Sequence, residues 1–182
     1  MKNFVIVASI ALALSACSTT KKVDLDPVSN ETTKYVQDFG KVEVTFTDDG
    51  QWTQIKSSAT SAVPIREDLG LEQAMNVATM RAKRNIVEFI NTDLKSSKTT
   101  DTITKALAKN VSEDDATTKQ RAANIATDIT EKIAVEANGI LKGVYVIERK
   151  VSSDKSSVVV VVQVDKRSMR AAQQLRASFG SN

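Results

Sequence analysis

The stretch Ser157-Val158-Val159-Val160-Val161-Val162-Gln163-Val164-Asp165 is the most β-branched run in the chain. β-branched residues favour strands. Five consecutive valines show no alternation of apolar and polar residues, which is typical of a strand with both faces covered. We therefore expect residues 157–165 to form a central strand with helices packed against it. The preceding segment 140–151 is also strand-like, and the polar residues 152–156 between the two predict a turn.

A second hairpin is predicted nearer the N-terminus. Val42, Val44 and Phe46 alternate with polar residues, which is the pattern of a half-buried strand, and Asp48-Asp49-Gly50 is typical of a turn. The hairpin should span about 41–47 and 51–58; residues 57–62 are small and polar, and Pro64 closes the region. Trp52, the only tryptophan, is interpreted as a packing residue in preference to a binding one.

Helical spacing governs the middle of the chain. An apolar stripe from Leu71 to Ile90 predicts a helix over 69–94, and the Lys/Ser/Thr-rich interval 95–102 should end it. A short helical turn is expected around 103–107. Ser112 before the acidic residues 113–115 is interpreted as a helix cap, in preference to a divalent-ion site. A second long helix should span about 122–137 and end at Asn138-Gly139, and a short amphipathic helix should run from Lys166 to Phe179 and end at Gly180.

The predicted element order, β-β-α-α-β-β-α, indicates an α+β fold. Two β-hairpins should form a mostly antiparallel sheet of about four strands, packed against two long helices and a short C-terminal helix. The relative direction of the two hairpins stays open. An exposed edge of the 41–58 hairpin is expected to pair with the sheet of another copy, giving concentration-dependent oligomers.

The N-terminus carries an export signal. Lys2 precedes an apolar stretch, Phe4 to Leu14, of about 11 residues, which is shorter than the roughly 18 that a membrane-spanning helix needs. Leu14-Ser15-Ala16-Cys17 follows and contains the only cysteine. We expect a signal peptide over 1–16, a lipidated Cys17 with a flexible tether over 17–36, and one α+β domain over 37–180. The alternative is an ordinary secretory signal followed by an incidental cysteine.

The amino-acid composition excludes several classes of function. Without residues 1–16 the chain keeps 24 of its 25 basic residues and all 22 acidic ones, so no electrostatic case exists for nucleic acid. No histidine is present, which excludes His-based triads and the usual His/Cys zinc sites. We expect no cofactor, no metal and no enzymatic activity. A hydrolase built on Glu43 or Asp165 is the disfavoured alternative, because nothing in the sequence pairs these carboxylates.

Several of these segments resemble known lipoproteins. The Leu-Ser-Ala-Cys ending resembles the lipobox of bacterial lipoproteins, which implies acylation of Cys17 and cleavage before it. Ser18, being other than Asp, implies release to the outer membrane by similarity to the enteric sorting rule. Over roughly 68–176, the helix 72–86, the strand 143–146 and the run 158–164 resemble the lipoprotein-20 family of FlgP-like flagellar and envelope lipoproteins.

The resemblance implies a lipid-anchored outer-membrane protein whose domain faces the periplasm. It further implies a structural or assembly role with other envelope proteins and with copies of itself, in flagellar or other envelope structures. Only Cys17 carries over as a functional residue. The alternative from the residues themselves is an envelope lipoprotein that binds a small ligand or a lipid between its sheet and its helices.

Overall fold

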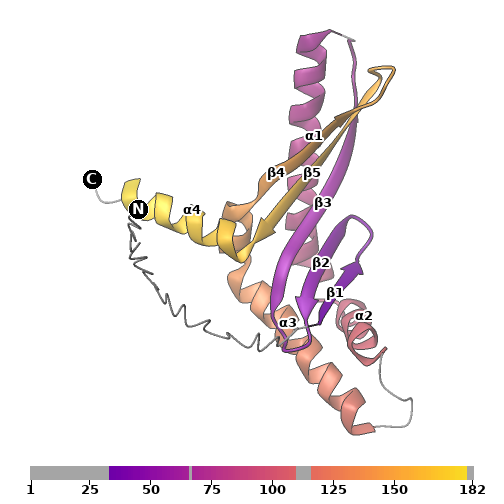
Figure 1. The fold of residues 1–182 in the computed structure, drawn as a ribbon, viewed down its shortest axis with the longest axis vertical. Helices are drawn as coiled ribbons and strands as arrows, with labels where there is room; N and C mark the ends of the chain where they lie inside the picture. The colour runs from indigo at the N-terminus through magenta and orange to yellow at the C-terminus, as the bar shows by residue number, and fades with distance from the viewer. Residues whose placement is uncertain (1–32, 66, 110–115, 180–182) are drawn as a thin grey trace, which may run out of the picture. The chain divides into compact units, whose positions relative to one another are not determined.

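Five strands form one sheet in the computed structural model, which describes residues 33–65, 67–109 and 116–179. The strand order is β1-β2-β3-β5-β4 and every pairing is antiparallel (Figure 1). The strands are β1 (Lys34–Asp38), β2 (Val42–Thr47), β3 (Trp52–Ala62), β4 (Tyr145–Val151) and β5 (Ser157–Asp165). The helices are α1 (Asp68–Glu88), the π-helical η1 (Phe89–Asp93), α2 (Ser97–Ala108), α3 (Ala116–Gly143) and α4 (Lys166–Phe179). The predicted α+β class with an antiparallel sheet is confirmed.

The additional strand is β1, which overlaps the predicted tether at residues 34–36. Its hydrophobic pattern is weak, but the Tyr35 ring stacks on Phe46 of β2 with 5.7 Å between ring centroids. In the turn that follows, Phe39 packs against Phe89 of η1, with 5.3 Å between centroids. One aromatic contact thus joins a polar segment to the sheet, and the other joins it to η1. The rest of the predicted tether up to residue 32, and Cys17 with it, lies outside the described residues.

The valine strand lies between β3 and β4, and its burial alternates. Val158, Val160, Val162 and Val164 are buried on the face along which α1 packs, whereas Val159 and Val161 are half-buried. The prediction that both faces are covered is therefore wrong. A run of one residue type conceals the alternation, because valine suits both a packed face and a more open one.

Helix α1 lies on β3 and β5 through a stripe of small residues. Gly70, Ala74, Ala78 and Ala82 are buried at every fourth position, whereas Leu71 and Met75 from the predicted stripe are half-buried. The second half of β3, residues 57–62, is also built from small side chains, and the strand predicted to end near residue 58 continues to Ala62. Small residues on both sides allow a close approach of helix and sheet.

The predicted end of the first long helix is confirmed, because residues 94–96 form a turn between η1 and α2, but the rest of the interval 95–102 is helical from Ser97 onward. After the π-helical turn η1, Ser96 caps α2 by accepting a hydrogen bond from the Thr99 N–H at 3.3 Å. The buried Thr99 hydroxyl donates to the Asp93 carbonyl at 2.6 Å. Thr99, Ile103 and Leu107 then form the buried stripe of a full 12-residue helix in place of the predicted short turn. Serine and threonine here serve as caps and not as loop formers.

Helix α3 passes through Asn138-Gly139 and ends at Gly143, so the predicted C-cap is wrong and residues 140–143 are not strand. Gly139 and Gly143 face Met169 of α4. A Cβ added to Gly143 would lie 2.9 Å from the Met169 backbone nitrogen. These glycines allow α4 to approach α3 closely. The predicted bounds of the C-terminal helix are confirmed through Phe179.

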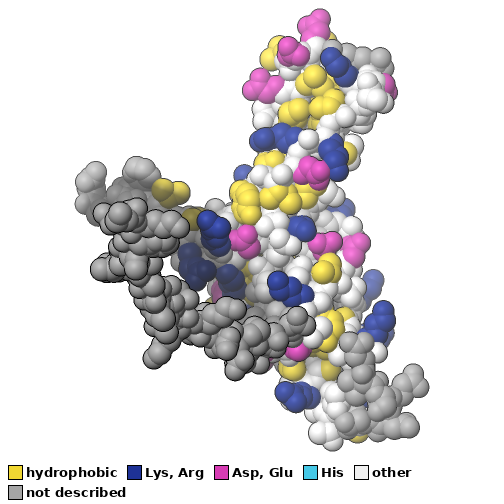
Figure 2. Space-filling model, in the orientation of Figure 1, with side chains coloured by type: hydrophobic (Ala, Val, Ile, Leu, Met, Phe, Trp, Pro, Cys, Tyr) yellow, Lys and Arg dark blue, Asp and Glu magenta, His cyan; other side chains and the backbone are white. Residues whose placement is uncertain are grey.

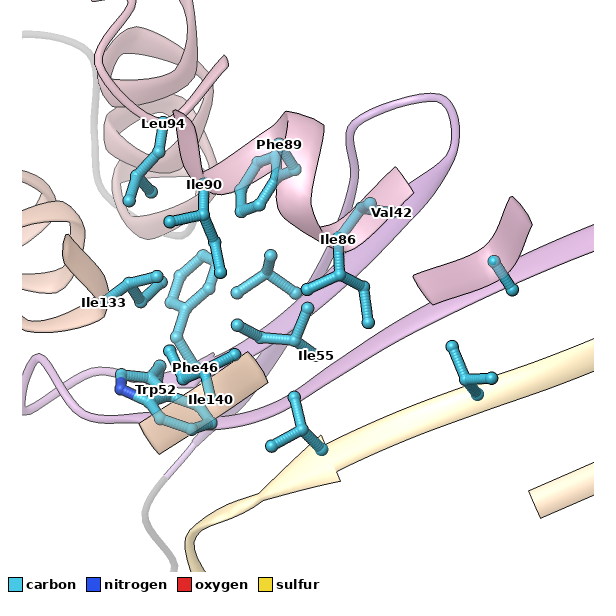
Figure 3. Close-up of a cluster of buried hydrophobic side chains, with 14 of the residues drawn as sticks. Val42, Phe46, Trp52, Ile55, Ile86, Phe89, Ile90, Leu94, Ile133 and Ile140 are labelled. Carbon is cyan, nitrogen blue, oxygen red and sulfur yellow. The ribbon is translucent and has the colours of Figure 1, made fainter. Parts of the chain in front are cut away.

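The largest buried side chains meet where the β2–β3 hairpin, the end of α1 with η1, and α3 converge (Figure 3). Trp52 is completely buried there, which confirms its interpretation as a packing residue. Gly50 in the hairpin turn has a φ of 79°, as the Asp48-Asp49-Gly50 turn requires. The cluster includes Phe46, Trp52, Ile55, Ile86, Phe89, Ile90, Ile133 and Ile140.

Candidate functional site

The one predicted site residue, Cys17, lies outside the described residues, as does the acidic segment 113–115. Within the described ranges, no helix has the length and apolar character to cross a bilayer. The same ranges contain no group of three His, Cys, Asp or Glu side chains placed to hold a metal ion. A candidate site must therefore be sought among the described surfaces and polar clusters of the domain.

A groove of about 440 Å³ lies between β1, the β2–β3 turn, α2 and α3. Its lining combines apolar groups with charges of both signs. Near its edge, the Lys132 ammonium donates to the Gly50 carbonyl at 2.9 Å and ties the turn to α3. A mixed lining of this kind suits a small amphipathic molecule. The main lining residues are Tyr35, Asp48, Asp49, Leu107, Arg121 and Ile125.

A polar cluster around Trp52 joins β3, α3 and α4. The Trp52 indole N–H donates to Glu136 Oε2 at 2.9 Å, and the Lys166 ammonium pairs with the same oxygen. Lys166 Nζ also lies 4.1 Å from the centroid of the Trp52 ring. With its indole buried and its N–H bonded, Trp52 offers no surface on which a ligand could stack. The cluster holds α4 to the core.

Asp165 ends β5 and caps α4. Its Oδ1 accepts the Ser168 N–H at 2.7 Å, and its Oδ2 accepts from the Tyr145 hydroxyl at 3.1 Å and from the Gln163 amide at 3.2 Å. Burial raises the pKa of Asp165, but the hydrogen bonds from Ser168, Gln163 and Tyr145 outweigh it and lower the pKa overall. Burial and the neighbouring Asp165 raise the pKa of Tyr145.

The two carboxylates considered for a hydrolase have separate partners. Glu43 on β2 lies 3.6 Å from the Lys56 ammonium on the neighbouring strand, while Asp165 caps α4. A general acid needs a raised pKa, which is opposite to the shift of Asp165. Both carboxylates thus take part in local contacts and are not joined in a catalytic pair.

The predicted exposed edge of the 41–58 hairpin is wrong, because β1 covers β2 and β5 covers β3. The outer strands of the sheet are β1 and β4. Tyr145, Ile147 and Val151 of β4 are each about two-fifths exposed, and charged residues 148–150 lie between them. Figure 2 shows apolar side chains mixed with charged ones over this part of the sheet. A bulge between Val146 and Glu148 interrupts the pairing of β4 with β5.

Comparisons with known proteins add no relative: no family model, curated protein or solved structure matches the chain. Sequence reasoning missed the edge strand and the groove. One signal for the edge was present, since charges in the middle of an otherwise apolar strand are typical of sheet edges. The groove had no comparable signal, because its lining comes from four separate elements.

Proposed function

We propose that the chain is a bacterial lipoprotein anchored in the outer membrane by lipid on Cys17, with its domain facing the periplasm. The observation that carries this proposal is the Leu14-Ser15-Ala16-Cys17 sequence directly after a short apolar segment. Each buried methylene contributes about 0.8 kcal/mol, so two or more acyl chains hold a protein stably on a bilayer. The anchor therefore requires no membrane-binding surface on the domain.

A structural or assembly role in the envelope fits this anchor better than catalysis. The chain has no histidine, and the Trp52 and Asp165 clusters are occupied in holding α4. The edge of β4 offers a route to self-association. The resemblance to the lipoprotein-20 family extends the proposal to envelope or flagellar assemblies.

The groove beside β1 supports one alternative, an envelope lipoprotein that carries a small ligand or a lipid. Its volume of about 440 Å³ falls within the usual range for small-molecule sites. Binding of an amphipathic probe that is lost in Arg121→Ala would favour this alternative over a purely structural role.

Substitution of Cys17 tests the anchor directly. The wild-type protein should incorporate a palmitate analogue, begin at Cys17 by mass spectrometry and fractionate with the outer membrane. Cys17→Ser should lose both the label and stable lipid anchoring, because no sulfur remains to be acylated, whereas the neighbouring Ser18→Ala should keep both. By the enteric sorting rule, Ser18→Asp should keep the lipid but stay in the inner membrane. A native chain that begins upstream of Cys17, or that carries no fatty acid, would contradict the proposal.

A further inference from the structure

Helix α4 combines strong positive charge with weak packing. Its sequence, KRSMRAAQQLRASF, contains four basic residues and no acidic one. Lys166 is paired with Glu136, whereas Arg167, Arg170 and Arg176 form no ion pair with any acid of the described residues. Figure 2 shows basic side chains gathered around the position of α4 in Figure 1.

Only the first half of α4 is held by the domain. Met169 is buried against Gly139 and Gly143 of α3, but every residue from 173 to 178 is exposed. An isolated helix of this length is marginal in water. The C-terminal half of α4 therefore has little support from the described part of the domain.

The outward side of α4 is amphipathic. At 100° per residue, the side opposite Met169 carries Arg167 and Arg170 next to Ala171 and Leu175. Leu175 is 59% exposed. The helix dipole opposes a cation in the first turn, so helix stability does not explain the position of Arg167. Cations beside an exposed leucine are the pattern of a helix that lies at a membrane interface.

We propose that α4 is a second membrane contact, whose outward side lies on the anionic phospholipids of the leaflet that holds the lipid on Cys17. The inference rests on the proposed lipid anchor. Each cation near an anionic surface raises partitioning about fivefold, so Arg167 and Arg170 on the outward side contribute about 25-fold. That is too weak to hold a free protein but sufficient for a tethered one, whose effective concentration at the surface is in the millimolar range. The contact would thus set the orientation of the domain.

The test uses the full lipidated chain in nanodiscs of phosphatidylcholine with or without phosphatidylglycerol. Ser178→Cys introduces a thiol on the exposed side of α4, and an environment-sensitive fluorophore on it reports contact through a quencher in the lipid phase. Acylation blocks the sulfur of Cys17, so the chain without Ser178→Cys should take up no fluorophore. Labelling of that chain would contradict the lipid anchor itself, separately from the role of α4.

We expect strong quenching on discs that contain phosphatidylglycerol and little on neutral discs. The double variant Arg167→Gln/Arg170→Gln should lower the docking equilibrium constant by about 25-fold. The matched control Lys83→Gln/Lys98→Gln removes the same charge from exposed positions of α1 and α2 and should keep the contact. At molar salt, α4 of the protein without arginine substitutions should leave the membrane surface. This measurement tests the contact without depending on the folding of a variant.

Equal quenching on both kinds of disc would overturn the proposal, as would equal loss in the double variant and its control. A partner that is an acidic protein would give no lipid-dependent quenching, which also overturns the membrane contact.

Discussion

At the scale of single residues, Gly143 and Gly139 fix how closely α4 approaches α3. A Cβ on Gly143 would lie 2.9 Å from the backbone nitrogen and 3.0 Å from the Cα of Met169. Backbone cannot move aside cheaply, so Gly143→Ala should lower the free energy of unfolding by about 1–3 kcal/mol. Urea denaturation followed by circular dichroism measures the change.

Gly139→Ala is the matched control. Its Cβ would lie 2.9 Å from the terminal methyl group of Met169 and 3.4 Å from the side-chain nitrogen of Gln173, and both are the far ends of flexible side chains that adapt readily. Replacing glycine inside a helix also gains up to about 1 kcal/mol. We therefore expect this variant to be neutral or slightly stabilised. A Gly143→Ala protein as stable as Gly139→Ala would show that the two helices are not tightly packed at this point.

Asp165 should make stability depend on pH. Its folded pKa is lowered, so the ionised carboxylate contributes stability that is complete above the unfolded pKa of about 3.9 and is lost as the pH falls through the folded pKa. Asp165→Asn keeps a capping oxygen but removes the charge at the start of α4, which should cost about 0.5 kcal/mol at neutral pH.

Denaturation of the wild type and of Asp165→Asn across pH 7 to 2 measures this difference. The two stability curves should lie apart near neutrality and converge in acid. Asp154, whose pKa its hydrogen bonds with Ser152 and Ser156 lower to about 2, is present in both proteins and cancels in the comparison. Curves that run parallel over the whole range would contradict the role assigned to the Asp165 charge.

At the scale of elements, local patterns predicted several elements well. The turn over 152–156, the strand 157–165 and the helix 166–179 lie where the sequence placed them. In each, the signal lies within the element: a β-branched run, a polar turn, or an apolar residue at every third or fourth position. The prediction of lipid on Cys17 also rests on a local signal, the Leu14-Ser15-Ala16-Cys17 sequence, and it stays a prediction.

Other elements depend on partners that the sequence does not reveal. β1 forms a strand because the Tyr35 ring stacks on Phe46, and α3 continues through Gly139 because Met169 packs against that glycine. Asn-Gly predicts a helix end and a close helix contact equally well until the neighbour is known. The strand order that hides the 41–58 hairpin and exposes β4 is likewise a property of the whole sheet, as is the groove beside β1.

At the scale of the whole molecule, the exposed edge of β4 decides how copies could assemble. The Ser152 N–H donates to the Ser157 carbonyl at 2.9 Å, and hydrogen bonding alternates along an antiparallel pair. The backbone groups of Lys150 and Glu148 therefore point toward β5, whereas those of Arg149 and Val151 point outward. A second β4 can pair antiparallel with this edge.

Charge selects one register for such a pairing. In the register centred on Arg149, Glu148 of each copy lies opposite Lys150 of the other, and Ile147 of each copy lies opposite Val151 of the other. The same register places the two Arg149 side chains opposite each other, which is unfavourable. Registers centred on Glu148 or Lys150 place two like charges directly opposite each other at that residue and lack the paired Glu148–Lys150 contacts. Each favourable cross-strand pair contributes only about 0.2–1 kcal/mol, so association should be weak and concentration-dependent.

A mixing experiment isolates this contact. Glu148→Lys and Lys150→Glu each place like charges opposite one another across the edge, so each variant alone should remain monomeric by light scattering in detergent at concentrations where the wild type associates. An equimolar mixture of the two should associate again, because both cross-strand pairs between positions 148 and 150 are then of opposite sign. Both variants also break the contact between Glu148 and Lys150 within one chain, where the oxygen and nitrogen lie 2.7 Å apart, and mixing cannot restore that contact. Recovery on mixing thus reports pairing between copies, whereas a mixture that stays monomeric, or single variants that associate like the wild type, would exclude the β4 edge as the assembly surface.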